Sequence, residues 1–268
     1  MIFHYMLHAD SARHKNLKTL FDKIDECGYY SVLLTYSSHQ NDLWVKSINL
    51  MNPKYKFKFQ PAIRTYAIAP EYFAMIYNAC EEISPNKYMF NIISGNLWNG
   101  TENTLENIVW IKDLIDTPEK RLDYTLDWIE KLKKSKMIVR NFPEIVMSGV
   151  TDQTLQNAAA HADYTLPMLS DFIDDPKKFM VTKKVMVCGA IVIRDSFEEA
   201  EKIVDQGRPS HQKMWTLYGT ESDILKEIKK IKDLGCTDFM IRQLTNDKEI
   251  YRIHDFVKKY KDFNWGSL

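Results

Sequence analysis

The sequence of 268 residues has no excess of either charge, few cysteines and no long apolar run. Lysine plus arginine equals aspartate plus glutamate at 36 each, so the chain lacks the basic field with which proteins condense on nucleic acid. No apolar run approaches the ~18 residues of a membrane span. The N-terminus runs directly into a predicted strand, without the marks of a signal peptide. We therefore expect a soluble, cytoplasmic protein that binds neither nucleic acid nor membranes.

The four cysteines are Cys27, Cys80, Cys188 and Cys236, and they lie far apart in the sequence. None belongs to a CxxC pair, which favours reduced, packed thiols over disulfides or zinc ligands. Cys188 falls within a predicted strand and has no recognisable partner base. We interpret it as buried and inert rather than as a nucleophile. No metal site is predicted.

No internal repeat or Pro/Gly-rich linker divides the chain, so we expect residues 1–268 to form a single domain. This length is close to the roughly 250 residues of one (β/α)8 barrel. Apolar runs typical of buried parallel strands alternate with segments of helical periodicity. The predicted strands are 2–7, 31–36, 56–64, 88–93, 144–148, 164–169, 185–193 and 239–242. Residues 207–219 are interpreted as an irregular link.

Eight strands that alternate with helices favour a closed α/β TIM barrel. An open, doubly wound sheet stays as the alternative, because a strand count does not reveal whether the sheet closes.

Residues 56–95 hold the densest set of signals. Pro70 is suited to open a helix, because the first turn needs no N–H from it, and Pro85 ends that helix. The flanking strands leave three polar residues, Arg64, Asn91 and Ser94, at their carboxyl ends. Parallel α/β sheets place their ligand sites at those ends, so we expect these side chains to lie in one site.

A second segment, residues 148–152, joins a predicted strand to a predicted helix. Gly149 allows a tight turn, and the free N–H groups at the helix start would face an anion placed there. An ordinary helix cap by Thr151 or Asp152 explains the same residues. The residues alone leave both interpretations open.

Two further residues end predicted strands. His8 could move a proton near neutral pH, or could be a loop residue or a cap. Arg64 could bind a carboxylate, sulfonate or phosphate with its planar fork, or could pair with Glu71.

The order of these motifs along the chain resembles a known family. Phe59-x-Pro61-Ala62-Ile63-Arg64, a helix, and then Met89-Phe90-Asn91-Ile92-Ile93-Ser94-Gly95 are similar to the bacterial luciferase-like flavin monooxygenases, in particular the alkanesulfonate branch. The resemblance implies a TIM barrel and reduced FMN supplied by a separate flavin reductase. It further implies that O2 is used to oxidise a small organic substrate. The alternatives are a deazaflavin (F420)-dependent oxidoreductase and a non-catalytic flavin-binding protein on the same barrel.

The resemblance also implies roles for individual residues. His8 and Arg64 would be catalytic, and Asn91 and Ser94 would contact the flavin ring. The phosphate of FMN would lie against Ser148, Gly149, Val150 and Thr151. Substrate would contact His39, Gln40 and Arg208.

Several positions depart from the alkanesulfonate enzymes. Gln40 stands where those enzymes have a cysteine, Cys188-Gly189-Ala190 replaces an Arg-x-His pair, and the lid is reduced to residues 207–213. These departures argue against an alkanesulfonate substrate more strongly than against the flavin site.

The segments 42–52 and 71–84 carry more apolar residues than one inward face needs. Trp44, Met51, Tyr72 and Met75 are the examples, and related luciferase-like proteins pair through this side. A twofold homodimer is therefore expected.

Overall fold

The structure is a computed structural model. It describes residues 1–7, 17–35, 43–48, 50, 53–94, 117–138, 141–207, 213–242 and 247–267. Four of the predicted site residues, His8, His39, Gln40 and Arg208, lie outside these ranges, as does Met51 of the predicted dimer surface.

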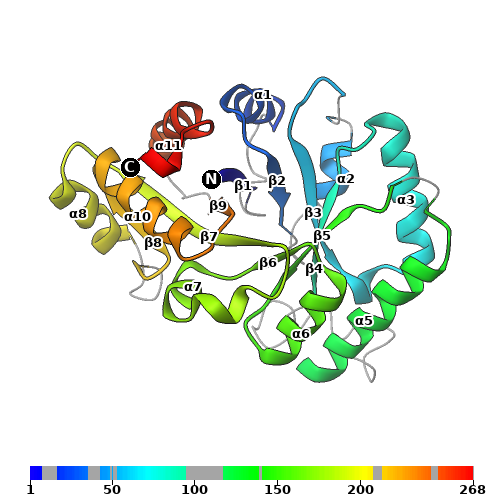
Figure 1. Cartoon of the computed structure of the whole chain (residues 1–268). Helices are drawn as coiled ribbons and strands as arrows, with labels where there is room; N and C mark the ends of the chain where they lie inside the picture. Colours follow the sequence, from blue (N-terminus) through cyan, green and yellow to red (C-terminus); the bar gives the residue numbers. More distant parts are fainter. Residues whose placement is uncertain are drawn as a thin grey trace.

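Parallel strands of the described chain close into a barrel (Figure 1). The order around the ring is β6-β5-β4-β3-β2-β1-β9-β7, and β6 also pairs with β7, which closes the sheet. The predicted TIM barrel is confirmed and the open sheet is wrong. The strands are β1 (Ile2–Leu7), β2 (Ser31–Leu34), β3 (Lys58–Arg64), β4 (Met89–Ile93), β5 (Glu144–Ser148), β6 (Tyr164–Leu166), β7 (Lys184–Ile193) and β9 (Asp238–Arg242).

A further strand, β8 (Thr216–Gly219), stands outside the ring. Residues 186–189 of β7 pair with β9, whereas residues 190–193 continue beyond the barrel and pair with β8. Gly189 sits at this change of partner, where a Cβ atom would lie 3.2 Å from the backbone oxygen of Trp215. The interpretation of residues 207–219 as an irregular link is therefore wrong over β8. A strand of four residues with only two apolar or aromatic members, Leu217 and Tyr218, is too short to be recognised by pattern alone.

Helices surround the ring, and local sequence explains where several of them begin and end. Pro70 is the first residue of its helix, and Thr117 caps the helix that starts at Pro118. Gly28 has φ 81° just past the end of the first helix, a conformation that favours glycine. The helices are α1 (Leu17–Cys27), α2 (Leu43–Ile48), α3 (Pro70–Ile83), α5 (Pro118–Lys134), α6 (Asp152–His161), α7 (Leu169–Asp174), α8 (Phe197–Gly207), α10 (Glu221–Asp233) and α11 (Asp247–Tyr260).

Three short 3-10 turns complete the described elements: η2 (Thr65–Ala67), η4 (Pro176–Phe179) and η5 (Trp265–Ser267). η4 follows shortly after the end of α7. α8, β8 and α10 lie together at the left of Figure 1. In the part of the chain that the structure describes, no helix combines the length and the apolar character needed to cross a bilayer.

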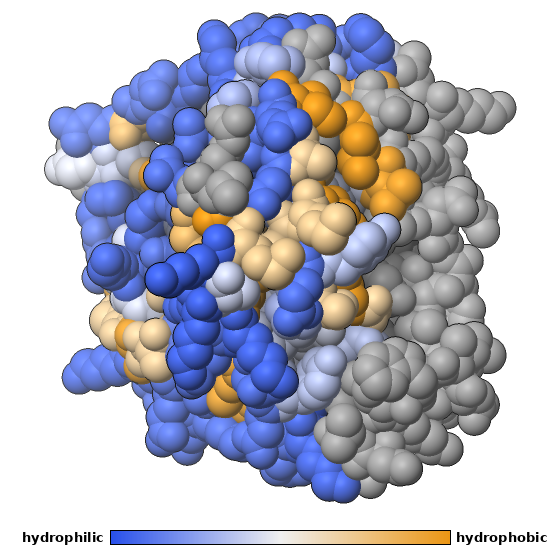
Figure 2. All heavy atoms as spheres, turned by 90° about the vertical axis from the view of Figure 1, so that its right-hand side faces the viewer, coloured by the Kyte–Doolittle hydropathy of each residue, from blue (hydrophilic) through white to orange (hydrophobic). Residues whose placement is uncertain are grey.

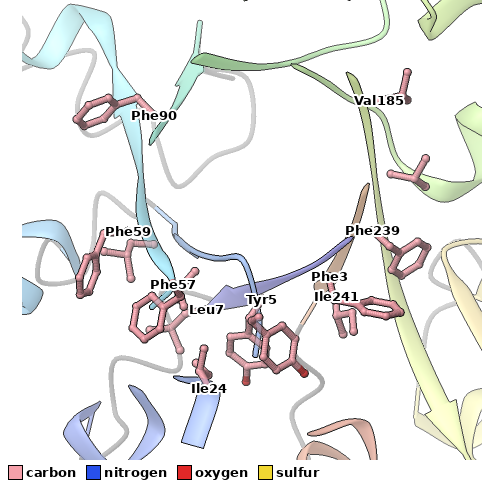
Figure 3. Close-up of a cluster of buried hydrophobic side chains, with 14 of the residues drawn as sticks. Phe3, Tyr5, Leu7, Ile24, Phe57, Phe59, Phe90, Val185, Phe239 and Ile241 are labelled. Atoms are coloured by element: carbon pink, nitrogen blue, oxygen red, sulfur yellow. The ribbon is translucent and has the colours of Figure 1, made fainter. Parts of the chain in front are cut away.

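The main hydrophobic core lies between the strands and the surrounding helices. Phe59, Phe90 and Phe239 point from their strands away from the centre of the ring (Figure 3). Phe73 of α3 meets Phe90 edge to face, with ring centroids 4.7 Å apart. Ile83 keeps the helical spacing of the buried residues of α3 but is exposed, because it is the last residue of the helix and lies past the final buried turn.

A second, smaller core fills the inside of the barrel and is rich in methionine. Its buried members are Leu33, Met89, Val146, Tyr164, Leu166, Met186, Cys188 and Met240, with Met6 and Met168 packed against them. Unbranched, polarisable methionine side chains fill such an irregular space well.

Candidate functional site

The carboxyl ends of β3, β4 and β5 bring four of the predicted site residues to one edge. Asn91 and Ser148 point into the barrel from neighbouring strands, and Ser148 Oγ donates to Asn91 Oδ1 at 3.0 Å. The Asn91 side chain is buried, whereas Ser148, Ser94 and Arg64 are partly exposed. The predicted gathering of strand-end residues is thus present for this part of the set.

The turn after β5 leads from this strand into the N-terminus of α6. Gly149 has φ 152°, and a Cβ atom there would lie 2.5 Å from Cγ2 of Thr154. Thr151 caps α6, because its hydroxyl accepts from the backbone N–H of Thr154 at 3.2 Å. The cap interpretation of Thr151 is therefore confirmed. The cap does not use the backbone N–H groups of Asp152 and Gln153. These are the first two residues of α6, and the helix contains no carbonyl that could accept from them.

Charges around the first turn of α6 nearly balance. Asp152 is the acidic residue of this turn and pairs with Lys178 of η4 at 3.1 Å. Both side chains are substantially exposed, so the pair contributes little to stability. Its effect is to offset a negative charge that would otherwise oppose an anion at the helix start. Val150, in place of a small polar residue, is exposed.

Below these residues the barrel interior is apolar and contains sulfur. Cys188 Sγ lies 3.9 Å from Met6 Sδ. Burial raises the pKa of Cys188 to about 11, although the charge of Arg242 acts in the opposite direction. A buried thiol with a raised pKa stays protonated at neutral pH, in agreement with its interpretation as inert.

Arg242 and Trp215 belong to the same end of the barrel and were missed from the sequence. Arg242 is the last residue of β9, is aligned with Met6 of β1, and is partly exposed. Its guanidinium carbon lies 5.9 Å from the centroid of the Trp215 ring, within cation–π range. A strand-end arginine was the available signal, as at Arg64. Its aromatic neighbour directly precedes β8, which the sequence did not predict.

Another polar group is buried in the amino-terminal half of the barrel. His4 bonds Ser31 Oγ through Nδ1 at 2.7 Å and Asp238 Oδ1 through Nε2 at 2.8 Å. Ser31 Oγ donates in turn to Gln60 at 2.8 Å. These residue types match a hydrolase triad, but all four side chains are fully buried, so no substrate could reach them. We interpret the group as structural, with His4 held by its two partners within the barrel.

The amino-terminal end of the barrel is closed by a charged cluster around Glu144. Its carboxylate lies 2.5 Å from Nζ of Lys58 and 3.5 Å from Nζ of Lys184, and it accepts from the hydroxyl of Tyr30. Lys184 also donates to Tyr164 at 2.6 Å. Burial is the largest single influence and would raise the pKa of Glu144, but the hydrogen bonds and charges of Lys58, Lys184 and Tyr30 together outweigh it, so the net pKa is lowered.

A surface groove of about 450 Å³ opens beside this cluster. It is lined by Phe142, Glu144, Ala159, His161 and Asp163, among other residues. The groove is at the opposite end of the strands from Asn91 and Ser148 and contains none of the predicted site residues. We therefore assign the candidate site by the position of the strand ends and not by this groove.

No protein-family model matches this sequence, and no curated protein matches it. Solved structures do match in fold. The EDTA monooxygenase of Chelativorans sp. BNC1 aligns with a TM-score of 0.73 and 9% identity over 98% of this chain and 93% of that one. The oxygenating constituent of 3,6-diketocamphane monooxygenase of Pseudomonas putida, a type II Baeyer–Villiger enzyme in complex with FMN, gives 0.70 and 10%, with 96% of each chain covered.

The coenzyme F420-dependent tetrahydromethanopterin reductase of Methanopyrus kandleri is similar over 96% of this chain and 97% of that chain, with a TM-score of 0.66 and 12% identity. At these identities the likeness concerns the fold. The chain therefore has the TIM-barrel fold found in these FMN- and F420-dependent oxidoreductases.

Proposed function

We propose that this protein is a luciferase-like oxidoreductase that binds reduced FMN at the carboxyl end of its barrel and uses O2 to oxidise a small organic substrate. A separate flavin reductase would supply the reduced flavin. The observation that carries the proposal is the contact between Asn91 and Ser148, next to the glycine turn that opens α6. This contact places the polar end of β4 next to the N-terminus of α6.

The residues of this turn fit a phosphate group. The space beside Gly149 would be filled by any Cβ atom, so the backbone stays accessible only with glycine. The N–H groups of Asp152 and Gln153 lie at the positive end of the α6 dipole, where an anion is favoured. Thr151 Oγ1 adds a hydroxyl at the same place, and Lys178 offsets the charge of Asp152.

When bound, the flavin supplies the redox chemistry, and this chain binds and orients it. Ser148 and Thr151 would contact the phosphate, while Asn91 and Ser94 would hold the polar edge of the ring. Arg64 offers a permanent positive charge at the end of β3 for developing negative charge. His8 would transfer a proton, a role inferred from the sequence alone.

His39, Gln40 and Arg208 remain candidates for contact with substrate, also on the sequence alone. Two features distinguish the proposed substrate site from that of the alkanesulfonate enzymes. Gln40 stands in place of their cysteine, and residues 207–213 replace their longer lid.

F420 is the second candidate cofactor, because the fold matches F420-dependent enzymes over nearly the whole chain. An F420 enzyme would transfer a hydride without O2. A flavin-binding protein without turnover is the third candidate.

Anaerobic titration separates these functions. We expect reduced FMN to bind in the micromolar range or tighter, and to reoxidise on the protein at a rate different from that of free flavin when air is admitted. Tight binding of F420 without binding of FMN would select the hydride-transfer alternative. Tight binding of oxidised FMN without an effect on its reaction with O2 would select the non-catalytic one. Failure of both cofactors to bind would contradict the proposal.

The homodimer is a further part of the proposal, and it rests on the exposed face of α2 and α3. Val45, Tyr72 and Met75 are each about 60% exposed on this face, and apolar residues interrupt the polar surface there in Figure 2. Trp44 does not belong to this surface. It is buried, with its ring centroid 5.6 Å from that of Phe90.

Sedimentation at micromolar concentration tests the pairing. We expect a dimer for the wild-type protein and a monomer for Met75→Glu. A monomeric wild-type protein would contradict this part of the proposal.

A further inference from the structure

Arg242 occupies a distinct position on the far side of the barrel from Asn91. β9 and β4 are opposite one another in the ring order, so Arg242 faces the candidate flavin site across the barrel mouth. Met240, two residues earlier on the same face of β9, belongs to the inner core, and the charge of Arg242 acts on Cys188 of that core. The arginine therefore stands directly above the apolar interior.

Among the described residues, the contact that holds the Arg242 guanidinium is an aromatic ring and not a carboxylate. The Trp215 ring covers the cation at 5.9 Å. In the ranges that the structure describes, no carboxylate forms an ion pair with it. Arg252, by contrast, pairs with Asp195 at 3.3 Å. A cation over an aromatic ring keeps the N–H groups at its edge available for an anion.

The floor next to Arg242 is apolar and adaptable. It consists of Met6, which is aligned with Arg242 across the strand pair, and of Cys188 and Met240 beside it. Methionine side chains adjust to ligands of different shape. A ligand that contacted both the Arg242 guanidinium and this apolar surface would need an anionic group and an apolar body.

The geometry points to a substrate subsite for organic carboxylates, in which Arg242 binds the carboxylate and the Met6–Cys188 floor accommodates the apolar part. The planar fork of arginine matches a carboxylate with two parallel hydrogen bonds. Trp215 acts as a positioning residue for Arg242. This inference rests on the proposed function, because it names the substrate class for the same site.

Binding to the flavin-free protein provides the test. Calorimetry would compare carboxylates from butanoate to decanoate, and phenylacetate, with their primary amides. We expect the best carboxylate to bind at least about tenfold more tightly than its amide, since a charge-assisted pair contributes that much or more. Trp215 is one of six tryptophans, so binding should also change the tryptophan fluorescence.

Variants locate the effect. Arg242→Gln should weaken carboxylate binding by about 10- to 100-fold, and Arg242→Lys by less, because lysine keeps the charge but loses the fork. Trp215→Leu should weaken it a few-fold and remove most of the fluorescence change. Arg252→Gln is the matched control and should have no effect. Thermal unfolding of each variant would show that it is folded.

The outcomes distinguish the inference from the proposed function. If no carboxylate binds better than its amide, or if Arg242→Gln binds as wild type does, the subsite is wrong even when FMN binds. If Arg242→Gln loses affinity for FMN, Arg242 contacts the cofactor and the subsite is also wrong. If carboxylates depend on Arg242 but neither reduced FMN nor F420 binds, the anion subsite stands and the proposed function fails.

Discussion

At the amino-terminal end of the barrel the polar side chains are paired with one another, whereas at the carboxyl end several of them stand at a partly exposed rim. The His4 group is fully buried and joined by bonds of 2.7–2.8 Å, and Glu144 is bonded to Lys58. Arg64, Ser94 and Arg242 are instead partly exposed at strand ends. Polar residues therefore stabilise the fold at the amino-terminal end, and their partial exposure at the carboxyl end supports the proposal of a binding site there.

The largest effect on folding is expected for Asp238→Ala. The substitution removes the acceptor for His4 Nε2 in a site with no access to water, and an unsatisfied buried partner costs about 2–5 kcal/mol. Urea denaturation would measure the loss in the free energy of unfolding. Cofactor affinity of the folded protein should not change. A loss below about 1 kcal/mol would show that the pair is not a main source of stability.

His254 provides a pH-dependent test of stability away from the rim. It is a buried residue of α11, and the hydroxyl of Tyr29 lies 3.1 Å from its Nδ1. Burial lowers the pKa of His254 to about 4, with a smaller effect of Lys23 in the same direction. The unfolded chain binds the proton with a pKa near 6.5, so stability is lost as the pH falls from about 6.5 to about 4.

The loss attributable to this residue is about 3.5 kcal/mol at most, since each unit of pKa corresponds to about 1.4 kcal/mol. His254→Gln should flatten the curve of unfolding free energy against pH in this range. If the curves of variant and wild type run parallel, His254 does not titrate as described.

Glu144→Gln should have a smaller effect. The change leaves Lys58 and Lys184 near each other without their shared carboxylate, and the cluster is partly open to solvent. A loss of about 1–2 kcal/mol is expected. Chemical denaturation and cofactor titration of the same samples would test whether the effect stays at the amino-terminal end. A change in flavin affinity in Glu144→Gln would contradict the assignment of a purely structural role to the amino-terminal end.

Ser148→Ala should have the smallest effect on stability, about 0.5–1.5 kcal/mol, because Asn91 Oδ1 loses one donor near the rim. It should also weaken FMN binding a few-fold. Ser31→Ala is the control at the amino-terminal end: it removes a bond to His4 but should leave FMN affinity unchanged. Equal FMN affinity in Ser148→Ala and wild type would remove Ser148 from the site.

Sequence predicted the barrel because its strands are continuous apolar runs and its helices have clear faces. Pro70 and Gly28 also set helix ends through local backbone constraints. β8 was missed because its pairing depends on β7 extending beyond the ring, which no local pattern encodes. Ile83 followed the helical period but is exposed at the last position of α3.

The gathering of polar residues at the strand ends was predictable from the sequence. Arg64, Asn91, Ser94 and Ser148 end adjacent strands, and parallel strands bring such residues together. The bond between Ser148 and Asn91 joins residues 57 positions apart, so only the register of β4 and β5 reveals it. Arg242 was missed because its neighbour Trp215 precedes the unpredicted β8.

The central claim, a cofactor phosphate at the start of α6, is tested most directly by comparing Gly149→Val with Gly219→Val. The two glycines have φ values of 152° and 144°, and each lies shortly before a threonine that caps a helix, α6 or α10. At α10 the capping box is completed by the carboxylate of Asp223, whereas at α6 the same position is Thr154. Both substitutions introduce similar backbone strain. We predict that Gly149→Val raises the dissociation constant for reduced FMN by about 30-fold or more, the equivalent of about 2 kcal/mol, and that Gly219→Val leaves it unchanged. Equal FMN affinity in both variants would contradict the account.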